Sequence, residues 1–152
     1  IIMTYKYFVL FIIFELYVIL MFNFFTIEND KFIDVLALQK CNHTSNYTIH
    51  GLWKENKQFC KNDSFNVDLI EPLIPVLNTI WYTCYDSNLG KYYYSNVDFW
   101  KHEYNKHGSC FKHLNEYQYF NKTIELYNKL SRSDCDPEKL ECLIPTTSIR
   151  NI

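Results

Sequence analysis

The chain has 152 residues, of which 48% are hydrophobic and 18% aromatic, and it contains only three Gly and four Pro. This composition supplies a packed core and excludes an intrinsically disordered chain. The net charge of −2 and the sequence pI of about 6.2 argue against the basic surface with which proteins hold duplex DNA tightly. They allow an enzyme that meets nucleic acid transiently in an acidic compartment, because protonation of the five His would make the charge positive.

Residues 1–26 contain the most apolar run of the chain and are interpreted as a signal peptide. The run from Tyr7 to Phe25 is interrupted only by Glu15 and Asn23. No small-x-small cleavage site follows it, and its length nearly spans a bilayer, so a retained signal anchor is the alternative. A buried core helix is less favoured because the run has no polar face.

Six cysteines and four N-x-Ser/Thr triplets point to the oxidising secretory pathway, with residues 27–152 as one secreted domain. From the residues alone, fifteen disulfide pairings are open. Such triplets are glycosylation acceptors, although they also arise by chance in an Asn-rich chain. The cysteines are Cys41, Cys60, Cys84, Cys110, Cys135 and Cys142, and the acceptors are Asn42, Asn46, Asn62 and Asn121.

The first predicted elements are two strands and a helix. Phe32 to Gln39 is a short apolar run typical of a buried strand, and Tyr47 to Trp53 has the β-branched and aromatic content of a second. Apolar residues then recur at helical spacing from Ile70 to Trp81, where Pro72 and Pro75 suit only the first turn.

Two further helices are predicted after an aromatic loop. Asp98 can cap a helix that runs from Phe99 to His107 and stops at Gly108. The last helix, residues 116–130, has one apolar face. Strands and helices mix without a βαβ rhythm, so we expect an α+β domain with a central, mainly antiparallel sheet flanked by helices. The apolar face consists of Tyr117, Phe120, Ile124, Tyr127 and Leu130.

The segment TIHGLW carries the first chemical signal. His50 stands next to Gly51, which would let a substrate approach the backbone, and three residues before Trp53. Trp53 offers a stacking face for an unpaired base, an interaction worth about 1–3 kcal/mol. From this segment alone, the favoured interpretation is a His that lies in the core beside a core Trp, without a catalytic role.

The segment FWKHEYNKHGSC carries the second signal. On a helix, Glu103 and His107 lie four residues apart on one face, which Lys106 borders. His102 and His107 are separated by about 140° around the helix, so they cannot grip one ion as the His pair of a zinc helix does. The pattern therefore argues against a metalloprotease. A solvated charged face is the plainer alternative, but Trp100 lies among the charges.

Two histidines on separate elements suit the cleavage of a phosphodiester by its own ribose 2′-hydroxyl. One base must take the hydroxyl proton and one acid must protonate the leaving oxygen, and imidazole serves both roles near its ordinary pKa of about 6.5. Lys106 and His102 could offset the charge of the five-coordinate intermediate, and a protonated Glu103 could donate a hydrogen bond to it. The predicted substrate is RNA and not DNA, with no metal and no cofactor.

TIHGLW and FWKHEYNKHGSC resemble the two active-site signatures of the ribonuclease T2 family, which includes acid endoribonucleases and plant self-incompatibility ribonucleases. In order and spacing the resemblance extends from about Phe32 to Leu130. It implies an endoribonuclease that cuts single-stranded RNA to a 2′,3′-cyclic phosphate and then a 3′-phosphate at mildly acidic pH. It also fits a protein that is extracellular or in the endolysosomal lumen, and we expect a monomer that meets a membrane only if residues 1–26 stay uncleaved.

The resemblance assigns roles by position. His50 and His107 correspond to the main catalytic histidines and Glu103 to their acidic partner, whereas Lys106 and His102 correspond to phosphate and transition-state contacts. Trp53 matches the base-stacking position. The implied disulfides are Cys41–Cys84 and Cys60–Cys110, which leaves Cys135–Cys142 as a third pair that the family does not assign.

The chain departs from the family pattern at three places. Lys54 follows HGLW where the family usually has Pro, and Lys40 follows Gln39 where it has Trp-Pro. Family members also continue for several tens of residues past the position of Ile152, so a truncation of the domain at its C-terminus is left open. The alternative function is a secreted, glycosylated, ribonuclease-like interaction protein without activity.

Overall fold

The computed structural model describes residues 14, 15, 17, 33–41, 46–61, 65–84, 95–130 and 134–149. The chain divides into two compact units, residues 1–32 and 33–152. In the first unit, Phe14, Glu15 and Tyr17 are helical and exposed, and the rest of the predicted signal segment lies outside the described residues. Within the described parts of the chain, no helix has the length and apolarity that a bilayer span requires.

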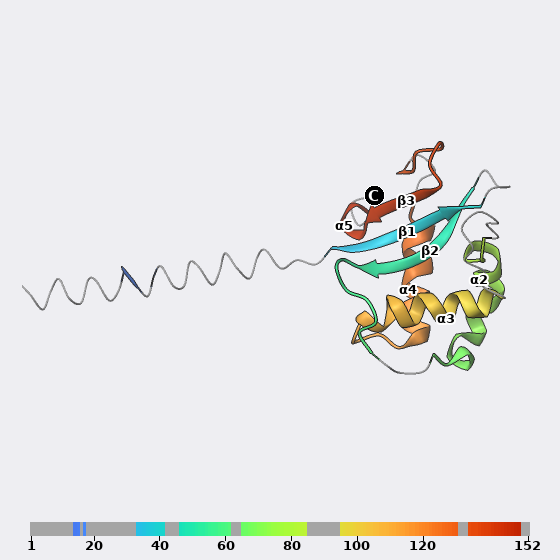
Figure 1. Ribbon diagram of the computed structural model, residues 1–152, viewed down its shortest axis with the longest axis horizontal. Coiled ribbons are helices and arrows are strands. Elements are labelled where there is room, and N and C mark those ends of the chain that lie inside the picture. Colours follow the sequence, from blue (N-terminus) through green and yellow to red (C-terminus); the bar gives the residue numbers. More distant parts are fainter. Residues whose placement is uncertain are drawn as a thin grey trace, which may run out of the picture. The chain divides into compact units, whose positions relative to one another are not determined.

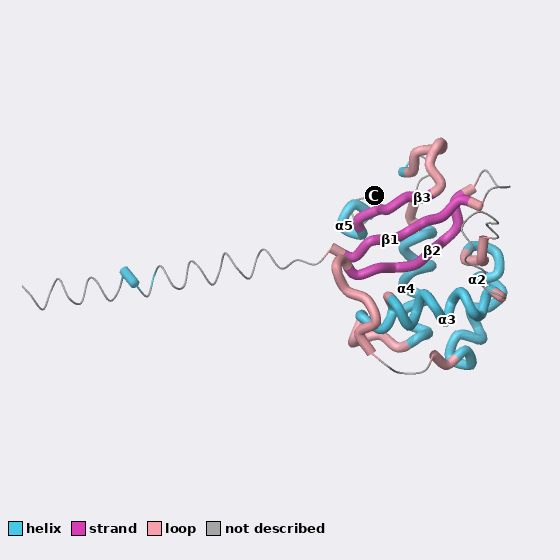
Figure 2. The backbone as a smooth tube through the Cα atoms, viewed as in Figure 1, coloured by secondary structure: helices cyan, strands magenta, loops and turns pink. Residues whose placement is uncertain are grey.

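The second unit is an α+β domain with an antiparallel three-stranded sheet in the order β2-β1-β3 and helices packed around it (Figures 1 and 2). This confirms the predicted fold class. In chain order the elements are β1 Asp34–Lys40, β2 Tyr47–Lys54, the 3-10 helix η1 Val67–Leu73, α2 Ile74–Ile80, α3 Asn96–Lys106, the 3-10 helix η2 Gly108–Cys110, α4 Glu116–Asn128, β3 Glu141–Pro145 and α5 Thr146–Ile149.

β1 is the central strand, and its apolar run is buried on both faces. Leu36, Ala37 and Leu38 are at most 2% exposed, which is why the sequence reads as a continuous apolar stretch. β2 extends one residue beyond the prediction, to Lys54. There the Lys54 ammonium lies 3.5 Å from the Asp34 carboxylate on β1 and 4.7 Å from the centre of the Phe111 ring. A residue that departs from the family pattern thus completes the β1–β2 pairing.

A β-bulge interrupts this pairing at the first candidate histidine. Ala37 pairs with Gly51, whereas Leu38 pairs with Ile49, so His50 is the extra residue without a partner on β1. Bulges bend the strand and re-aim the side chain. The side chain of His50 therefore has a different direction from the one it would have in a regular, uninterrupted β-ladder.

The sequence analysis did not predict β3, which pairs with the other edge of β1. Its register aligns Leu38 with Cys142 and Gln39 with Glu141. Ile144 and Cys142 point inward and alternate with exposed residues. One of these exposed residues is Leu143, which is 56% exposed, so the sequence reads as a short apolar run and not as the apolar/polar alternation of a strand. Its pairing with β1 gives it its strand conformation.

α4 begins at Glu116, as predicted, whereas the two earlier helices begin at places other than those predicted. The predicted helix before Trp81 starts as η1, with Pro72 inside it, and becomes α-helical at Ile74, with Pro75 in the first turn of α2. α3 is capped by Ser95 and not by Asp98, because the Ser95 hydroxyl accepts the Asp98 backbone N–H at 3.1 Å. Ser95 and Asp98 have the spacing of a capping box, and this signal marks the true start.

α4 packs against the sheet through a stripe shifted from the predicted one. Tyr117, predicted to be in the core, is 40% exposed, whereas Tyr119 is fully buried. The capping box between Asn115 and Gln118 fixes the start of the helix at Glu116. The buried stripe is Glu116, Tyr119, Phe120, Thr123, Ile124 and Leu126.

Tyr119 holds β2 in place next to the bulge. Its hydroxyl donates to the carbonyl of Leu52 at 3.1 Å and accepts the Leu52 N–H at 3.2 Å. We expect Tyr119→Phe to lower the free energy of unfolding by about 1–3 kcal/mol, because both Leu52 groups lose a buried partner. Urea denaturation measures this, and the exposed Tyr117→Phe should change stability by less than about 0.5 kcal/mol. Equal effects of the two variants would show that the buried bonds contribute nothing.

Three disulfides join the pairs expected from the sequence, Cys41–Cys84, Cys60–Cys110 and Cys135–Cys142. The second ties the segment after β2 to the end of η2. Two hydrogen bonds reinforce it, from the Cys60 N–H to Ser109 Oγ at 3.0 Å and from the Phe59 N–H to the carbonyl of Lys106 at 2.7 Å. The C-terminal end of α3 is therefore fixed relative to β2.

Candidate active site

His50 is held in its bulge from the backbone side. Trp81 donates its indole N–H to the carbonyl of His50 at 3.0 Å, and Trp100 donates to the carbonyl of Trp81 at 2.6 Å. Both tryptophans are fully buried. The imidazole packs beside Phe99, with ring centres 5.7 Å apart, and its side chain is 25% exposed. The buried core therefore fixes the backbone of His50, while its imidazole ring stays accessible to solvent.

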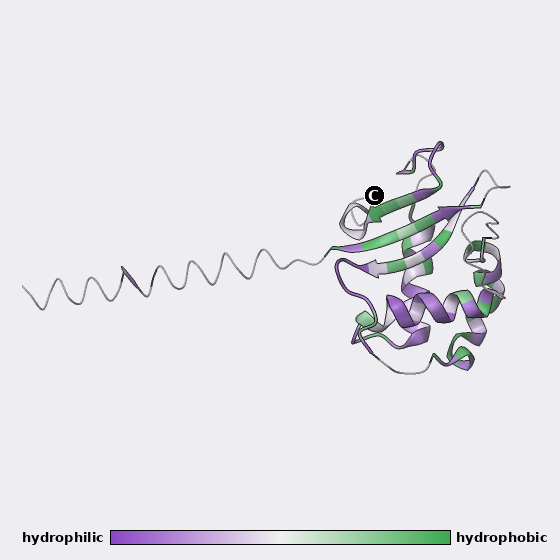
Figure 3. Cartoon of the chain, viewed as in Figure 1, coloured by the Kyte–Doolittle hydropathy of each residue, from purple (hydrophilic) through white to green (hydrophobic). Residues whose placement is uncertain are grey.

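Glu103 brings β2 and α3 together. Its Oε1 lies 3.4 Å from Nε2 of His50, and its Oε2 accepts the indole N–H of Trp53 at 3.1 Å. α3 is mostly hydrophilic (Figure 3), yet Glu103 is only 1% exposed. The carboxylate is therefore a buried link between the two segments that the sequence singled out.

Gly51 permits this close approach. A Cβ atom at position 51 would lie 2.6 Å from both Glu103 Oε2 and Trp53 Nε1. The sequence analysis expected Gly51 to admit a substrate. In the structure the space is taken by the side chains of Glu103 and Trp53.

The charge of Glu103 differs from the expectation that it is protonated. Burial alone would raise its pKa, but the hydrogen bond and charge of His50, the Trp53 hydrogen bond and the charge of His107 together lower the pKa below its ordinary value. Glu103 is therefore an ionised carboxylate. It can accept hydrogen bonds from the histidines, and it is not the donor that was expected.

His107 lies at the C-terminal cap of α3, with its backbone N–H bonded to the carbonyl of Glu103 at 2.9 Å. The residue is 3% exposed, and its ring stacks on Trp53 at 4.7 Å between centres and 22° between planes. Within the described chain, neither ring nitrogen has a hydrogen-bond partner. Glu103, Trp53 and both histidines thus form one contiguous cluster.

Burial lowers the pKa of His107 to about 4. Desolvation of the ring is the main cause; Glu103 opposes it, and the charges of Lys106, His50 and His102 add to it. His107 is therefore neutral over most of the acidic range. It does not contribute to the positive charge that protonation of all five His was expected to give in a mildly acidic compartment.

This shift predicts a stability that rises with pH. Between pH 4 and 6.5 the unfolded chain binds a proton at His107 that the folded chain does not, so the free energy of unfolding falls by roughly 3 kcal/mol from pH 7 to pH 4. Glu103 acts in the same direction at lower pH, because its pKa is also lowered on folding and its stabilisation is lost as pH falls. Urea denaturation at a series of pH values measures the slope. His107→Asn should flatten it above pH 4, and an unchanged slope would contradict the assignment.

The remaining predicted site residues are the two basic residues of α3 and the glycosylation acceptors. Lys106 and His102, both on α3 and partly exposed, act on His107 through their positive charge. Of the glycosylation acceptors, Asn46 is exposed and Asn121 donates to Glu125 at 2.7 Å, whereas Asn42 and Asn62 lie outside the described residues.

Sequence reasoning missed one charged neighbour of His50. Glu141 on β3 places its Oε1 3.8 Å from Nδ1 of His50. Because β3 itself was not predicted, no local signal could have pointed to this residue.

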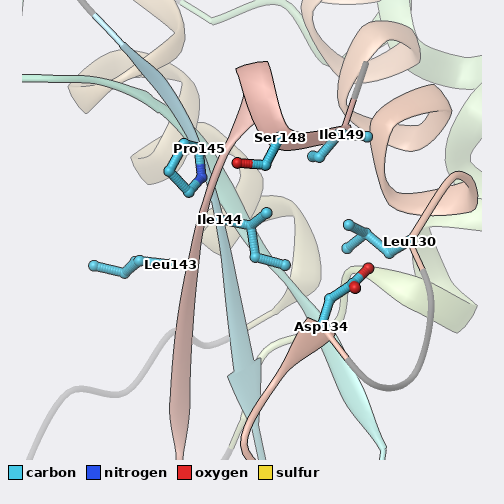
Figure 4. Close-up of a pocket in the computed structure, with 7 residues that line it drawn as sticks. All are labelled: Leu130, Asp134, Leu143, Ile144, Pro145, Ser148 and Ile149. Carbon is cyan, nitrogen blue, oxygen red and sulfur yellow. The ribbon is translucent and has the colours of Figure 1, made fainter. Parts of the chain in front are cut away.

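A cavity of about 290 Å³ lies elsewhere, beside β3 and α5 (Figure 4). None of the residues of the histidine cluster lines it, so it does not belong to the candidate active site. Its lining is largely apolar and consists of Leu130, Asp134, Leu143, Ile144, Pro145, Ser148 and Ile149.

The chain is similar in sequence to several ribonucleases. Ribonuclease T2 of Sus scrofa is 35% identical over 99 residues, which cover 61% of this chain and 48% of that protein. Ribonuclease DdI of Dictyostelium discoideum is 39% identical, with 56% of this chain and 38% of that protein covered. The chain therefore spans less than half the length of these relatives.

Solved structures show the same fold. Human RNase T2 matches with a TM-score of 0.58 and 25% identity, over 66% of this chain and 58% of that chain. A mutant of ribonuclease MC1 crystallised in complex with 5′-GMP matches with a TM-score of 0.54 and 26% identity, over 64% of this chain and 58% of that chain. A model of the ribonuclease T2 family matches residues 18–136. The chain belongs to the ribonuclease T2 family.

Proposed function

We propose that this chain is an endoribonuclease that cleaves single-stranded RNA through attack by the ribose 2′-hydroxyl. The product is a 2′,3′-cyclic phosphate, which water then opens to a 3′-phosphate. The observation that carries the proposal is the cluster of His50 and His107, from separate elements, around the buried carboxylate of Glu103. The relatives are named ribonucleases, and one solved relative was crystallised with 5′-GMP.

His107 suits the role of general base. With a pKa of about 4 it keeps a free lone pair at mildly acidic pH. It would take the proton of the 2′-hydroxyl while the oxygen attacks phosphorus. The stacked ring of Trp53 holds the imidazole in place, so little reorganisation is needed in the reaction.

His50 suits the role of general acid. As the bond from phosphorus to the 5′-oxygen breaks, His50 would give that oxygen its proton. The Glu103 carboxylate, 3.4 Å from Nε2, stabilises the protonated ring before transfer. In the second step the roles reverse, with His50 activating water and His107 protonating the 2′-oxygen.

The positive side chains of Lys106 and His102 would stabilise the charge that develops on the phosphoryl oxygens. One face of the Trp53 ring is stacked on His107, so an unpaired base would stack on the opposite face. None of these steps uses a metal, and DNA is inert because it lacks the nucleophile.

We also propose that the protein acts in the secretory pathway, outside the cell or in the endolysosomal lumen, as a monomer. Its three disulfides fit an oxidising compartment. The exposed Asn46 fits a glycosylation acceptor.

The test compares a single-stranded RNA with the all-deoxy strand of the same sequence, from pH 4 to 8 with a chelator present. We expect cleavage of the RNA alone, a cyclic phosphate as first product and no effect of the chelator. Circular dichroism confirms folding of the preparation. A folded chain that leaves RNA intact would support the alternative of a secreted interaction protein without activity.

A further inference from the structure

His50 has a carboxylate at each of its two ring nitrogens. Glu103 on α3 faces Nε2 at 3.4 Å, and Glu141 on β3 faces Nδ1 at 3.8 Å. The Nδ1 atom is buried and makes no hydrogen bond within the described residues. The remaining ring contacts, Trp53 and Phe99, carry no charge. Glu141 is thus the described carboxylate that the Nδ1 side faces.

The fold fixes the backbone of Glu141 firmly, although its side chain is 63% exposed. The residue pairs with Gln39 on β1, and the next residue, Cys142, is bonded to Cys135. Just before it, the carbonyl of Leu140 accepts the N–H of Lys40 at 2.8 Å. The carboxylate can therefore reach His50 without ordering a mobile loop.

The two nitrogens of an imidazole ring are not equivalent. A carboxylate beside one nitrogen favours a proton on that nitrogen and fixes the orientation of the ring. At 3.8 Å the contact is longer than a hydrogen bond, as catalytic contacts often are before substrate binds. Because the Glu141 side chain is largely exposed, solvent screens its charge and weakens the interaction with His50.

We propose that Glu141 is a positioning residue for His50: it favours a proton on Nδ1 and so fixes the ring with Nε2 beside Glu103, where the proposed proton transfer takes place. The consequence for catalysis rests on the proposed ribonuclease function. The contact itself does not, since it can be measured in the absence of RNA.

The experiment uses the full disulfide-bonded chain with ¹⁵N-labelled histidine, as Glu141→Gln and as the matched control Glu138→Gln. Glu138 is an exposed carboxylate three residues earlier, so both variants change the net charge equally. In Glu141→Gln we expect a lower fraction of neutral His50 with its proton on Nδ1, read from the ¹⁵N shifts. We expect kcat to fall about tenfold with KM unchanged, part of the roughly 10²–10⁴-fold effect of a positioned acid or base. Glu138→Gln should match the parent in both.

The outcomes separate the two proposals. If the ¹⁵N shifts of His50 are the same in Glu141→Gln and the parent, Glu141 does not position His50, whatever happens to the rate. If the shifts change but the folded parent cleaves no RNA, the contact is real and the proposed function is wrong. A fall in kcat without a change in tautomer would assign Glu141 another role and overturn the proposal.

Discussion

Replacing His107 by Asn is expected to lower kcat/KM for single-stranded RNA at pH 5 by about a thousandfold. A positioned base contributes about 10²–10⁴-fold to such a reaction. Among the described histidines, only His107 has a buried ring, so no other imidazole can take its place. Asn is uncharged and smaller than His, so the substitution introduces no new buried charge and no steric overlap. The fold should survive, which circular dichroism and urea denaturation would establish.

His50→Asn should produce a loss of similar size, and the double variant should be little worse than either single one. Residues that act in one proton-transfer step are strongly non-additive. His113→Asn is the control, because His113 is exposed and lies outside the cluster. Losses at His50 and His107 that multiply would indicate independent roles, and full activity in either variant would exclude two-histidine catalysis.

The parts of the site that were predictable from sequence are those set by local spacing. Glu103 and His107 lie one helical turn apart, and this alone places the carboxylate close to the ring on the same face of α3. β2 was also predictable, because its β-branched and aromatic residues have no helical pattern. Both features depend on residues within one element.

The parts that were not predictable depend on contacts between distant residues. The bulge at His50 arises from the register of β1 against β2, and no pattern in TIHGLW reveals it. Glu141 reaches the site only because β3 pairs with β1. The charge of Glu103 likewise depends on the partners that tertiary packing brings to it, and so the expectation of a protonated acid was wrong.

Gly51 is a local signal whose structural cause depends on tertiary contacts. A glycine within a strand, as here beside His50, indicates that another group approaches the backbone closely. The sequence suggested that the approaching group was substrate, whereas the structure shows Glu103 and Trp53. A methyl group at this position would therefore contact Glu103 and Trp53 even in the absence of RNA, which leads to a specific prediction.

Gly51→Ala is expected to lower kcat/KM about a hundredfold and the free energy of unfolding by about 1–3 kcal/mol. The added Cβ would lie 2.6 Å from both Glu103 Oε2 and Trp53 Nε1, so the carboxylate must move away from His50 and from the indole. Displacements of about 1 Å suffice for rate losses of this size. Cleavage kinetics and urea denaturation measure the two effects.

A double-mutant cycle with Glu103→Gln tests the cause. If Gly51→Ala acts by displacing the carboxylate, it should cost much less activity in the Glu103→Gln background than in the parent. Gly108→Ala is the matched control for stability, because its Cβ would lie 2.5 Å from the Tyr104 ring and not against Glu103. Equal losses of activity from Gly51→Ala in both backgrounds would mean that the methyl group blocks substrate directly, as the sequence alone suggested.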